Sequence, residues 1–527
     1  MKYWLTIVYC FFLIIQVDAQ NKQDINWVTG ASIVFVTNFD SNTITNTLYI
    51  DSTIGWGIYS VAGHSCISDS NGNLQFFCNG MNIYSKDYKL MEGGYKIAPD
   101  YYFSEDYGIS AYSQTSIILP VGNNQYYVFT PMCSDDLRHT WDNATTTDSI
   151  FFDLFWYHII DMNANNGMGK VVQSKIPLIE NGYLSKPEMM AVRHANGRDW
   201  WLLKGRYSSI GFHTFLVSSK GVEDYGIQNF PRYGQDYDWD LDGQCVFSPD
   251  GSKFATVIAH RGTINLFDFD RCSGKLSNQQ AINVPHLSTN NPLDSTEKEW
   301  RTTVGIAFSS NQQYLYVNGW NNVFQYELAE NDSSKAWIWL NKSTSSQSNY
   351  ANMYLAPNDK IYLGNKDGLQ GKWSVINNPN EKGINCNFEY KTFGFPLWYG
   401  ASAPPCMPNY RLGVLKGSVC DTIGNEPPIE PPFTNVSVVL PNAFSPNGDN
   451  LNDYFHILNV AKLVQEKVEF KEVVIYNRLG NRVFSSQDIN FQWDGNKMAN
   501  DTYFYYIRYK TKEGNNKVEK GDVILIR

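Results

Sequence analysis

The chain has 527 residues, of which 18 % are charged and 15 % aromatic, and its net charge at pH 7 is −10. This length fits one large domain with one or two small ones, and an excess of aromatic over charged residues is typical of all-β extracellular proteins. The acidic balance argues against nucleic acids and anionic membranes as partners, because both are themselves negatively charged.

Residues 1–19 are predicted to be a secretory signal peptide. Lys2 supplies a positive charge, an apolar run follows at residues 3–15, and Ala19 ends a stretch suited to signal peptidase. The run is too short to span a bilayer, and no other stretch is long and apolar enough to do so. Cys10 lies inside the run and not at the cleavage point, so we predict no lipid attachment. We therefore expect an exported chain with no membrane span after signal removal.

Loss of the signal peptide leaves eight cysteines, an even number that permits disulfides in an exported protein. No two of them have the close spacing of a zinc site. The eight are Cys66, Cys78, Cys133, Cys245, Cys272, Cys386, Cys406 and Cys420. Three pairs lie on predicted strands that could be neighbours, and each pair is either a disulfide or two buried thiols: Cys66 with Cys78, Cys245 with Cys272, and Cys406 with Cys420.

The long middle part, residues 20–424, repeats a strand, a tight polar turn and a second strand. The clearest copy is at residues 246–255, where Phe-Ser-Pro-Asp-Gly leads into the second strand. Asp and Gly favour such turns because Asp bonds nearby backbone and Gly accepts positive φ. Further copies lie at residues 68–77, 192–201, 307–316 and 355–362, and predicted strands at 264–269 and 322–326 lie between them.

The strong copies recur about every fifty to sixty residues, which is the length of one four-stranded propeller blade with its loops. We therefore predict an all-β fold with a β-propeller of about seven blades; six or eight blades, or a jelly roll or stacked sandwiches, are the alternatives. The Phe-Ser-Pro-Asp-Gly motif resembles those of WD-repeat-like propellers in exported bacterial proteins. We interpret it as a structural motif, since the turn itself uses the Asp and the Gly.

A proline-rich segment at residues 425–436 is predicted to be the linker after the propeller. Prolines at this density favour an extended polyproline II conformation. Beyond it, residues 437–527 alternate β-branched or aromatic runs with Gly, Asn and Asp turns, which predicts a small antiparallel sandwich. Residues 478–481 form a tight connection there, with Gly480 able to adopt positive φ.

This carboxy-terminal part resembles the gliding-motility-associated, type B sorting domain that Bacteroidota attach to cargo of the type IX secretion system. The resemblance rests on the motif at 441–453, the strand and turn at 473–484, Trp-Asp-Gly at 493–495, Thr-Tyr-Phe-Tyr at 502–505 and the last strand at 520–527. It implies an immunoglobulin-like β-sandwich that binds the type IX secretion machinery through residues 437–527. An ordinary fibronectin-like spacer module is the alternative.

Asp238, Asp240 and Asp242, followed by Gly243, match the front half of a calcium loop. Alternate carboxylates suit calcium, which takes six to eight oxygen ligands, and four like charges with Asp236 would otherwise repel. The distal acid of such loops is missing, so a solvated acidic loop is the alternative. Calcium is the one cofactor that the sequence suggests. A second oxygen cluster comprises Asn447, Asp449, Asn452 and Asp453, which we interpret as turn residues.

The sequence has no nucleophile elbow, no metalloprotease helix motif and no phosphate-binding loop, and its eight histidines are scattered. It therefore favours binding over catalysis. We expect a cell-surface or secreted cargo protein whose propeller binds a glycan, a polymer or another surface protein in an adhesion or interaction role. The rival is a secreted hydrolase or lyase acting on polysaccharides, which would need convergent acids at one mouth of the propeller channel.

Overall fold

The computed structural model contains two compact units, residues 1–426 and residues 427–527, each with its own hydrophobic core. The boundary between the units falls inside the proline-rich segment. Because the placement of some residues is not described, all statements below concern the following residues: 21–31, 33–48, 59–60, 63–99, 113–137, 151–207, 209–231, 243–258, 263–285, 303–319, 322–342, 350–365, 372–395, 403–421, 438, 440–441, 443–448, 453–458, 460–465, 467–495, 497–511 and 516–527.

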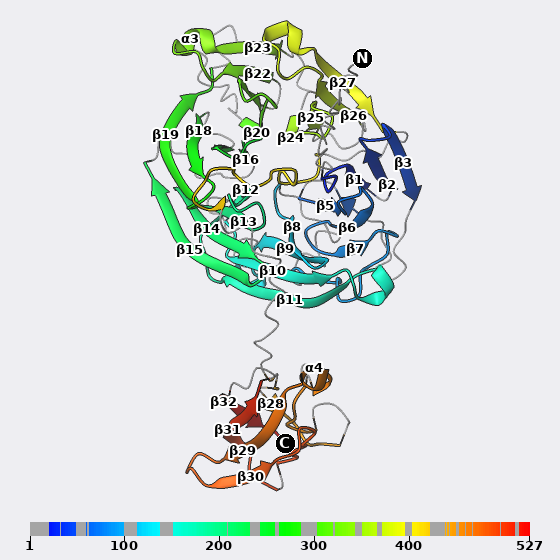
Figure 1. Ribbon diagram of the computed structural model, residues 1–527, viewed down its shortest axis with the longest axis vertical. Coiled ribbons are helices and arrows are strands. Elements are labelled where there is room, and N and C mark those ends of the chain that lie inside the picture. The colour runs from blue at the N-terminus through cyan, green and yellow to red at the C-terminus, as the bar shows by residue number, and fades with distance from the viewer. Residues whose placement is uncertain are drawn as a thin grey trace, which may run out of the picture. The chain divides into compact units, whose positions relative to one another are not determined.

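The described strands of the first unit form seven antiparallel sheets arranged in a ring (Figure 1). Six sheets have four strands and one has three, and we call them blades 1 to 7 in chain order. The predicted seven-bladed propeller is thus confirmed. Blade 1 comprises β1 (Asn26–Ala31), β2 (Ile33–Asn38), β3 (Thr43–Leu48) and β4 (Tyr59–Ser60), blade 2 comprises β5 (Ser65–Ser68), β6 (Leu74–Cys78) and β7 (Ile83–Ser85), and blade 3 comprises β8 (Ile117–Gly122), β9 (Gln125–Met132), β10 (Leu154–Asp161) and β11 (Lys170–Ile179).

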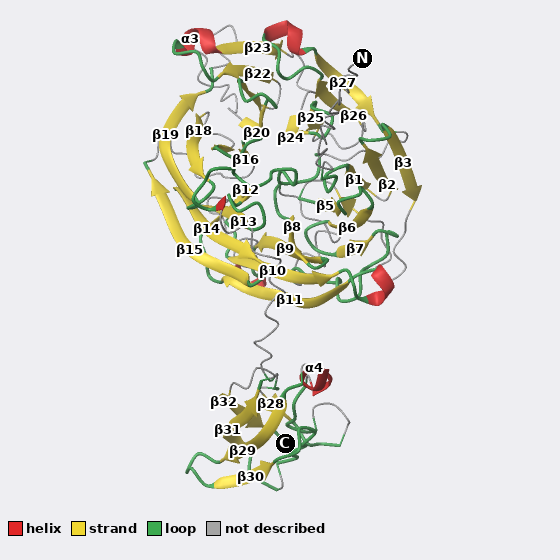
Figure 2. Cartoon of the chain, in the orientation of Figure 1, coloured by secondary structure: helices red, strands yellow, loops and turns green. Residues whose placement is uncertain are grey.

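The remaining blades follow the same plan, and strands dominate both units (Figure 2). Among the described residues, no helix is long and apolar enough to cross a membrane. Blade 4 comprises β12 (Leu184–Arg193), β13 (Trp200–Arg206), β14 (Ile210–Ser218) and β15 (Gly221–Phe230), and blade 5 comprises β16 (Gly243–Phe247), β17 (Lys253–Ile258), β18 (Thr263–Asp270) and β19 (Lys275–Asn283). Blade 6 comprises β20 (Thr303–Phe308), β21 (Tyr314–Gly319), β22 (Asn322–Glu327) and β23 (Trp337–Lys342), and blade 7 comprises β24 (Tyr350–Leu355), β25 (Ile361–Asn365), β26 (Lys372–Ile376) and β27 (Phe388–Gly394). Short helices lie at η1 (Asn165–Gly167), α3 (Ser333–Ala336) and η2 (Gly383–Cys386).

The inner and outer strands of a blade differ in how many of their residues are buried. All ten residues of the inner strand β12 are buried, whereas the outer strand β19 buries only two of its nine residues. An inner strand is covered on both faces by neighbouring blades, so that β12 buries even Lys186, Glu188 and Arg193, while an outer strand has one solvated side. The core therefore lies between blades and around the centre of the ring.

The predicted strand–turn–strand repeats join the first and second strands of blades 2, 4, 5, 6 and 7. In blade 5, the Asp250 carboxylate accepts hydrogen bonds from the Ser252 amide (2.9 Å) and the Ser248 hydroxyl (2.7 Å), and Gly251 has φ +75°. In blade 6, the Asn311 side chain accepts in the same way from the Gln313 amide. The acidic or amide residue and the glycine thus build the turn, as the motif indicated.

These turns define two faces of the ring. The first strands of blades 2 to 7 (β5, β8, β12, β16, β20 and β24) end at what we call the turn face and begin at the opposite loop face. Blade 7 meets blade 1 through aromatic packing, because Trp27 on β1 lies 5.7 Å from Tyr362 and 6.3 Å from Trp373 between ring centroids. Aromatic contacts of this kind add to the area buried between the two blades.

In the second unit, the described strands form one five-stranded sheet in the order β28-β32-β31-β29-β30. Phe455 and Trp493 form a bridge that packs on the core of this sheet, and Gly480 turns the β29–β30 hairpin with φ +79°. The all-β prediction is confirmed, while the immunoglobulin-like detail stays a prediction. The elements are β28 (Ala443–Phe444), α4 (Val460–Gln465), β29 (Glu469–Tyr476), β30 (Arg482–Ser486), β31 (Asp501–Lys510) and β32 (Asn516–Leu525).

Candidate functional site

A segment at residues 403–421, which we call the closing segment, occupies the centre of the ring and then part of the turn face. The Cys406 amide donates to the carbonyl of His64, just before β5, and the Tyr410 hydroxyl donates to the carbonyl of Ile118 in β8 (2.7 Å). Asn409 then donates to the carbonyl of Pro249, a turn-face residue of blade 5 (2.8 Å). The closing segment therefore bonds to blades 2, 3 and 5 from within the ring.

A disulfide holds the far end of the closing segment. Cys420 is bonded to Cys272 in the β18–β19 turn of blade 5, and the Leu415 amide donates to the carbonyl of Ala195 in blade 4 (2.8 Å). The Arg271 guanidinium also donates to the carbonyl of Gly413. The turn face of blades 4 and 5 is thus covered by the chain's own segment.

This pairing corrects two of the three cysteine pairs that the sequence suggested. Cys272 and Cys420 pair with each other and not with Cys245 and Cys406. Cys66 and Cys78 do lie on the neighbouring strands β5 and β6, but Cys66 is opposite Phe77 and Cys78 opposite Ser65. Because successive side chains of a strand point to opposite faces, these two thiols point away from each other. The other six cysteines of the described residues lie outside this disulfide and are buried: Cys66, Cys78, Cys133, Cys245, Cys386 and Cys406.

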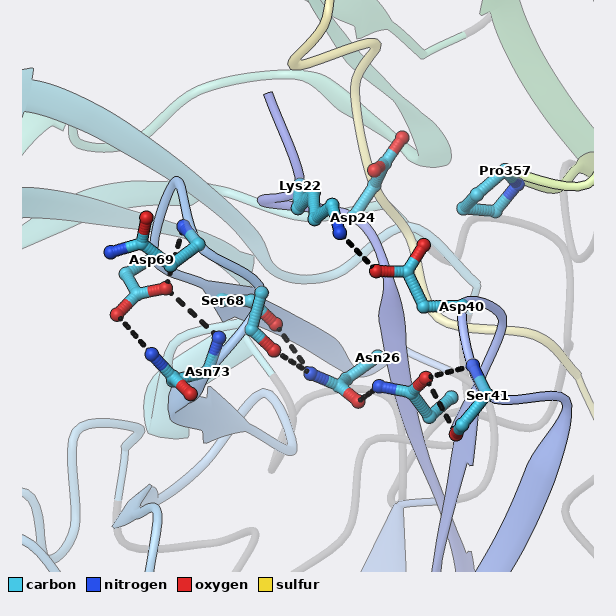
Figure 3. Close-up of polar contacts among 12 residues, drawn as sticks. Lys22, Asp24, Asn26, Asp40, Ser41, Ser68, Asp69, Asn73 and Pro357 are labelled. Carbon is cyan, nitrogen blue, oxygen red and sulfur yellow. Dashed lines mark hydrogen bonds and ion pairs between the residues drawn. The ribbon is translucent and has the colours of Figure 1, made fainter. Parts of the chain in front are cut away.

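Polar contacts also tie the turn face of blades 1 and 2. Figure 3 shows Lys22 paired with Asp40, Asn26 donating to Ser68, and Asp69 bonded to Asn73. Asp24, in the same region, pairs with Arg411 of the closing segment (2.9 Å). Burial raises the pKa of Asp24, while the Arg411 guanidinium acts in the opposite direction. The pair anchors the closing segment to blade 1.

Side-chain amides fill the interior of the ring beside the closing segment. Gln114 both donates to the carbonyl and accepts from the amide of Cys245 in β16, each at 2.9 Å. Gln244 donates to the carbonyl of Met353 in β24 and accepts from the amides of Met353 and Ile306. These side-chain amides bond to backbone groups of the inner strands in other blades, which pairs polar groups that would otherwise be buried without a partner. They thereby connect the inner strands near the centre of the ring.

An ionic cluster lies between blades 4 and 5. The Lys204 ammonium donates to the carbonyls of Ser185, Lys186 and Glu188, and the Glu188 carboxylate accepts from the Thr256 hydroxyl at 2.5 Å. Burial lowers the pKa of Lys204 to about 8, against the opposing effect of Glu188. Buried lysine–carboxylate groups occur at active sites and in structural networks. Here every donor of Lys204 is engaged with backbone, so the cluster fastens β13 to β12.

The loop face carries an aromatic platform between blades 3 and 4, formed by Phe151, Tyr183 and Tyr207. The rings of Phe151 and Tyr183 stack with 4.1 Å between centroids and 17° between planes. Tyr207 packs 5.6 Å from Phe151, and its amide donates to the carbonyl of Tyr183 (3.0 Å). Phe151 and Tyr207 are buried, but Tyr183 is 58 % exposed. An exposed ring with a rigid backing is suited to stacking on a ligand.

Backbone hydrogen bonds hold this platform in place. Phe152 and Leu184 exchange amide–carbonyl bonds of 3.0 and 2.9 Å, and the Gly182 amide donates to the carbonyl of Asp153 (2.9 Å). The Asp153 carboxylate in turn accepts from the Ser134 amide (2.6 Å). A Cβ at Gly182 would come within 2.5 Å of the Ile179 side chain, so any larger residue in the turn before Tyr183 would force Ile179 to shift. The exposed ring therefore sits on a rigid connection between two blades.

The predicted calcium ligands Asp238, Asp240 and Asp242 lie outside the described residues, so their site stays a prediction. Of the second oxygen cluster, the Asp453 carboxylate accepts from the amides of Asn447 (3.0 Å) and Gly448 (2.8 Å). This is the turn role expected from the sequence. Among the residues that the structure describes, no group of three or more His, Cys, Asp or Glu side chains is placed to hold a metal ion. Sequence reasoning missed the Tyr183 platform, because its rings come from two different blades.

Comparison with known proteins identifies the second unit. Residues 438–525 match the family model of the CHU_C type IX secretion signal domain. No curated protein matches the chain. Among solved structures, the chain is similar to a protein from Lactobacillus plantarum, with 10 % identity and a TM-score of 0.41 over 73 % of this chain and 98 % of that one.

Two other solved structures show similarity at the same low level. A periplasmic gluconolactonase from Pseudomonas aeruginosa has 10 % identity and a TM-score of 0.39 over 72 % of this chain and 97 % of its own. The β-propeller domain of Cps50 (Swd1) from Myceliophteria thermophila has 8 % identity and a TM-score of 0.34 over 66 % and 92 %. The carboxy-terminal match confirms the sorting-domain prediction: the second unit is a type IX secretion signal domain, and the chain is exported across the outer membrane to the cell surface or the extracellular space.

Proposed function

We propose that the propeller is an extracellular binding module that takes a glycan on its loop face, at the Phe151–Tyr183–Tyr207 platform. The observation that carries the proposal is the exposed Tyr183 ring, which is 58 % exposed although it stacks on Phe151. Aromatic rings pack against the apolar faces of pyranose sugars, and a tyrosine adds a hydroxyl for hydrogen bonding. A rigid ring also loses little conformational entropy when a ligand binds.

The position of the closing segment supports the choice of face. Residues 403–421 occupy the centre of the ring and cover the turn face of blades 4 and 5, with Tyr410 and Cys406 both buried. A ligand at that part of the turn face would have to displace the closing segment, which hydrogen bonds and a disulfide hold in place. In the described part of the chain, Tyr183 remains 58 % exposed on the loop face between blades 3 and 4, so we assign the ligand to that face.

The rival function, a polysaccharide-acting hydrolase or lyase, would use a carboxylate such as Glu188, which is buried beside Lys204 between blades 4 and 5. Glu188 and Lys204 are 2 % and 0 % exposed, and Lys204 is bonded to three carbonyls. A substrate would need access to that carboxylate. The exposed aromatic platform favours binding over this alternative.

A glycan-array screen of the purified mature chain, with hydrolysis assays on the same polysaccharides, tests the proposal. We expect retention of a defined class of glycans and no release of reducing ends or unsaturated products. Retention with turnover would favour the hydrolase or lyase. Absence of retention on all glycans would contradict the glycan assignment and favour a protein ligand.

A further inference from the structure

The last strand of the second unit, β32, leaves most of one edge open. It pairs along all ten residues with β31, from Asp501↔Leu525 to Lys510↔Asn516, without a register shift. On its other side, β28 pairs only with Ile524 and Leu525. Over the remaining residues 516–523, no strand in the described part of the chain pairs with this edge.

The direction of the backbone groups along the open edge follows from one hydrogen bond. The Ile526 amide donates to the carbonyl of Phe444, on the β28 side of the strand (3.1 Å). Amides alternate in direction along a strand, with a period of two residues. The amides of Val518, Lys520 and Asp522 therefore point out of the sheet, while those of the residues between them point to β31.

The residues whose amides point outward also have side chains that are open to solvent. Lys520 and Asp522 are exposed, and Val518 is 49 % exposed. An exposed edge strand with free amides and carbonyls is a template for a further strand, and charged residues on it limit indiscriminate pairing. Opposite Lys520 and Asp522, an added strand would be favoured by an acidic and a basic residue respectively.

We propose that the type IX secretion machinery recognises this unit by adding a β-strand of its own to the open edge of β32. The edge lies within residues 438–525, which match the secretion signal domain, so its partner is the machinery that reads the signal. Strand addition takes its affinity from main-chain hydrogen bonds and its selectivity from alternate side chains. This inference is independent of the ligand proposed for the propeller.

The test separates the outward amide from the side chain at one position. Lys520→Pro removes an outward amide but no hydrogen bond to β31, as proline is tolerated at an edge. Lys520→Ala removes the same charged side chain but keeps the amide. Ser485→Pro is the matched control at the opposite edge, because Ser485 lies between residues of β30 whose amides point to β29.

Each full-length variant is expressed in a strain with a type IX secretion system, and export is measured by cell fractionation together with the melting temperature of the purified chain. We expect Lys520→Pro to lower the exported fraction about tenfold, through loss of a backbone hydrogen bond and the added bulk of the ring. Lys520→Ala and Ser485→Pro should be exported like the parent.

Several outcomes would overturn the proposal. Export of Lys520→Pro at the parental level would show that the edge is not used. Equal loss in Lys520→Ala would indicate recognition of the charge and not of the edge. Loss of a dimer of the parent chain in Lys520→Pro, with unchanged export, would assign the edge to a second copy. Should Lys520→Pro melt early, Val518→Pro, at the next outward amide, provides the same test.

Discussion

Cys272 and Cys420 are joined by a disulfide across 148 residues of sequence, so that the end of the closing segment is tied to the β18–β19 turn of blade 5. The same segment contacts blade 1 through the Arg411–Asp24 pair and blade 3 through Tyr410. The propeller is therefore fastened by a segment that follows its last blade, in addition to the aromatic packing between blades 7 and 1.

We expect the disulfide to stabilise the propeller. Cross-linking a loop of this length lowers the entropy of the unfolded chain and contributes at most about 5 kcal/mol. Reduction, or Cys272→Ser with Cys420→Ser, should therefore lower the melting temperature measured by calorimetry. Thiol titration of the unfolded, unreduced mature chain should find the six remaining cysteines and not eight. Eight titrating thiols would refute the cross-link.

Acid should destabilise the propeller through His158. Its ring is fully buried, accepts from the Lys175 amide (3.1 Å) and lies 3.0 Å from the Thr130 hydroxyl. The pKa of His158 is lowered to about 3, mainly because the ring is buried and secondly because the charge of Lys175 is nearby. Below its ordinary pKa of about 6.5, the unfolded chain binds a proton that the folded chain does not, so stability is lost as the pH falls from 6.5 toward 3.

The contribution of this one group has a slope of about 1.4 kcal/mol per pH unit. Denaturant unfolding of the parent and of His158→Gln between pH 4 and pH 6.5 measures it. The variant is expected to be less stable at pH 7 but to depend less on pH. Parallel pH profiles of the two proteins would rule out His158 as a source of acid sensitivity.

Deletion of residues 437–527 should leave a folded propeller that is retained in the periplasm. The two units have separate hydrophobic cores, so the first does not need the second for its own packing. Fractionation shows where the truncated chain resides, and its melting temperature should match that of the propeller transition in the full chain. Surface exposure of the truncated chain would contradict the routing role of the second unit.

Calcium binding at Asp238, Asp240 and Asp242 is a prediction from sequence alone. Binding to the folded state at a hundredfold excess over Kd would stabilise the protein by about 2.7 kcal/mol, and extracellular calcium modules bind at roughly 0.1 to 1 mM. Millimolar calcium should thus raise the melting temperature, a chelator should reverse the rise, and Asp240→Asn should weaken it. Identical melting curves in calcium and chelator would leave a solvated acidic loop.

Local patterns made much of the fold predictable. The Ser248, Asp250 and Gly251 turn depends on contacts within a few residues, so its motif identified the β16–β17 hairpin directly. The Gly480 hairpin and the sorting-domain motifs were recognisable for the same reason. The length of one repeat, compared with the length of residues 20–424, then predicted about seven blades.

Contacts between distant segments were not predictable in this way. Cys420 lies beside Cys272 because residues 403–421 pass through the ring to blade 5. No local sequence pattern predicts that path. The stacking of Phe151 on Tyr183 depends on how blade 3 meets blade 4. Nothing in the sequence distinguishes Tyr183 from Tyr225, which is 51 % exposed on the outer strand β15.

That similarity makes Tyr225 the control for glycan binding at the loop-face platform. Calorimetric titration with a glycan retained on the array should compare the parent chain with Tyr183→Ala, Tyr183→Phe and Tyr225→Ala. Loss of a stacking ring at a binding site costs about 2 kcal/mol, or roughly 30-fold in Kd. We predict this loss for Tyr183→Ala, a smaller loss for Tyr183→Phe, which keeps the ring, and parental affinity for Tyr225→Ala. Parental affinity in Tyr183→Ala would show that the glycan does not bind at the loop-face platform.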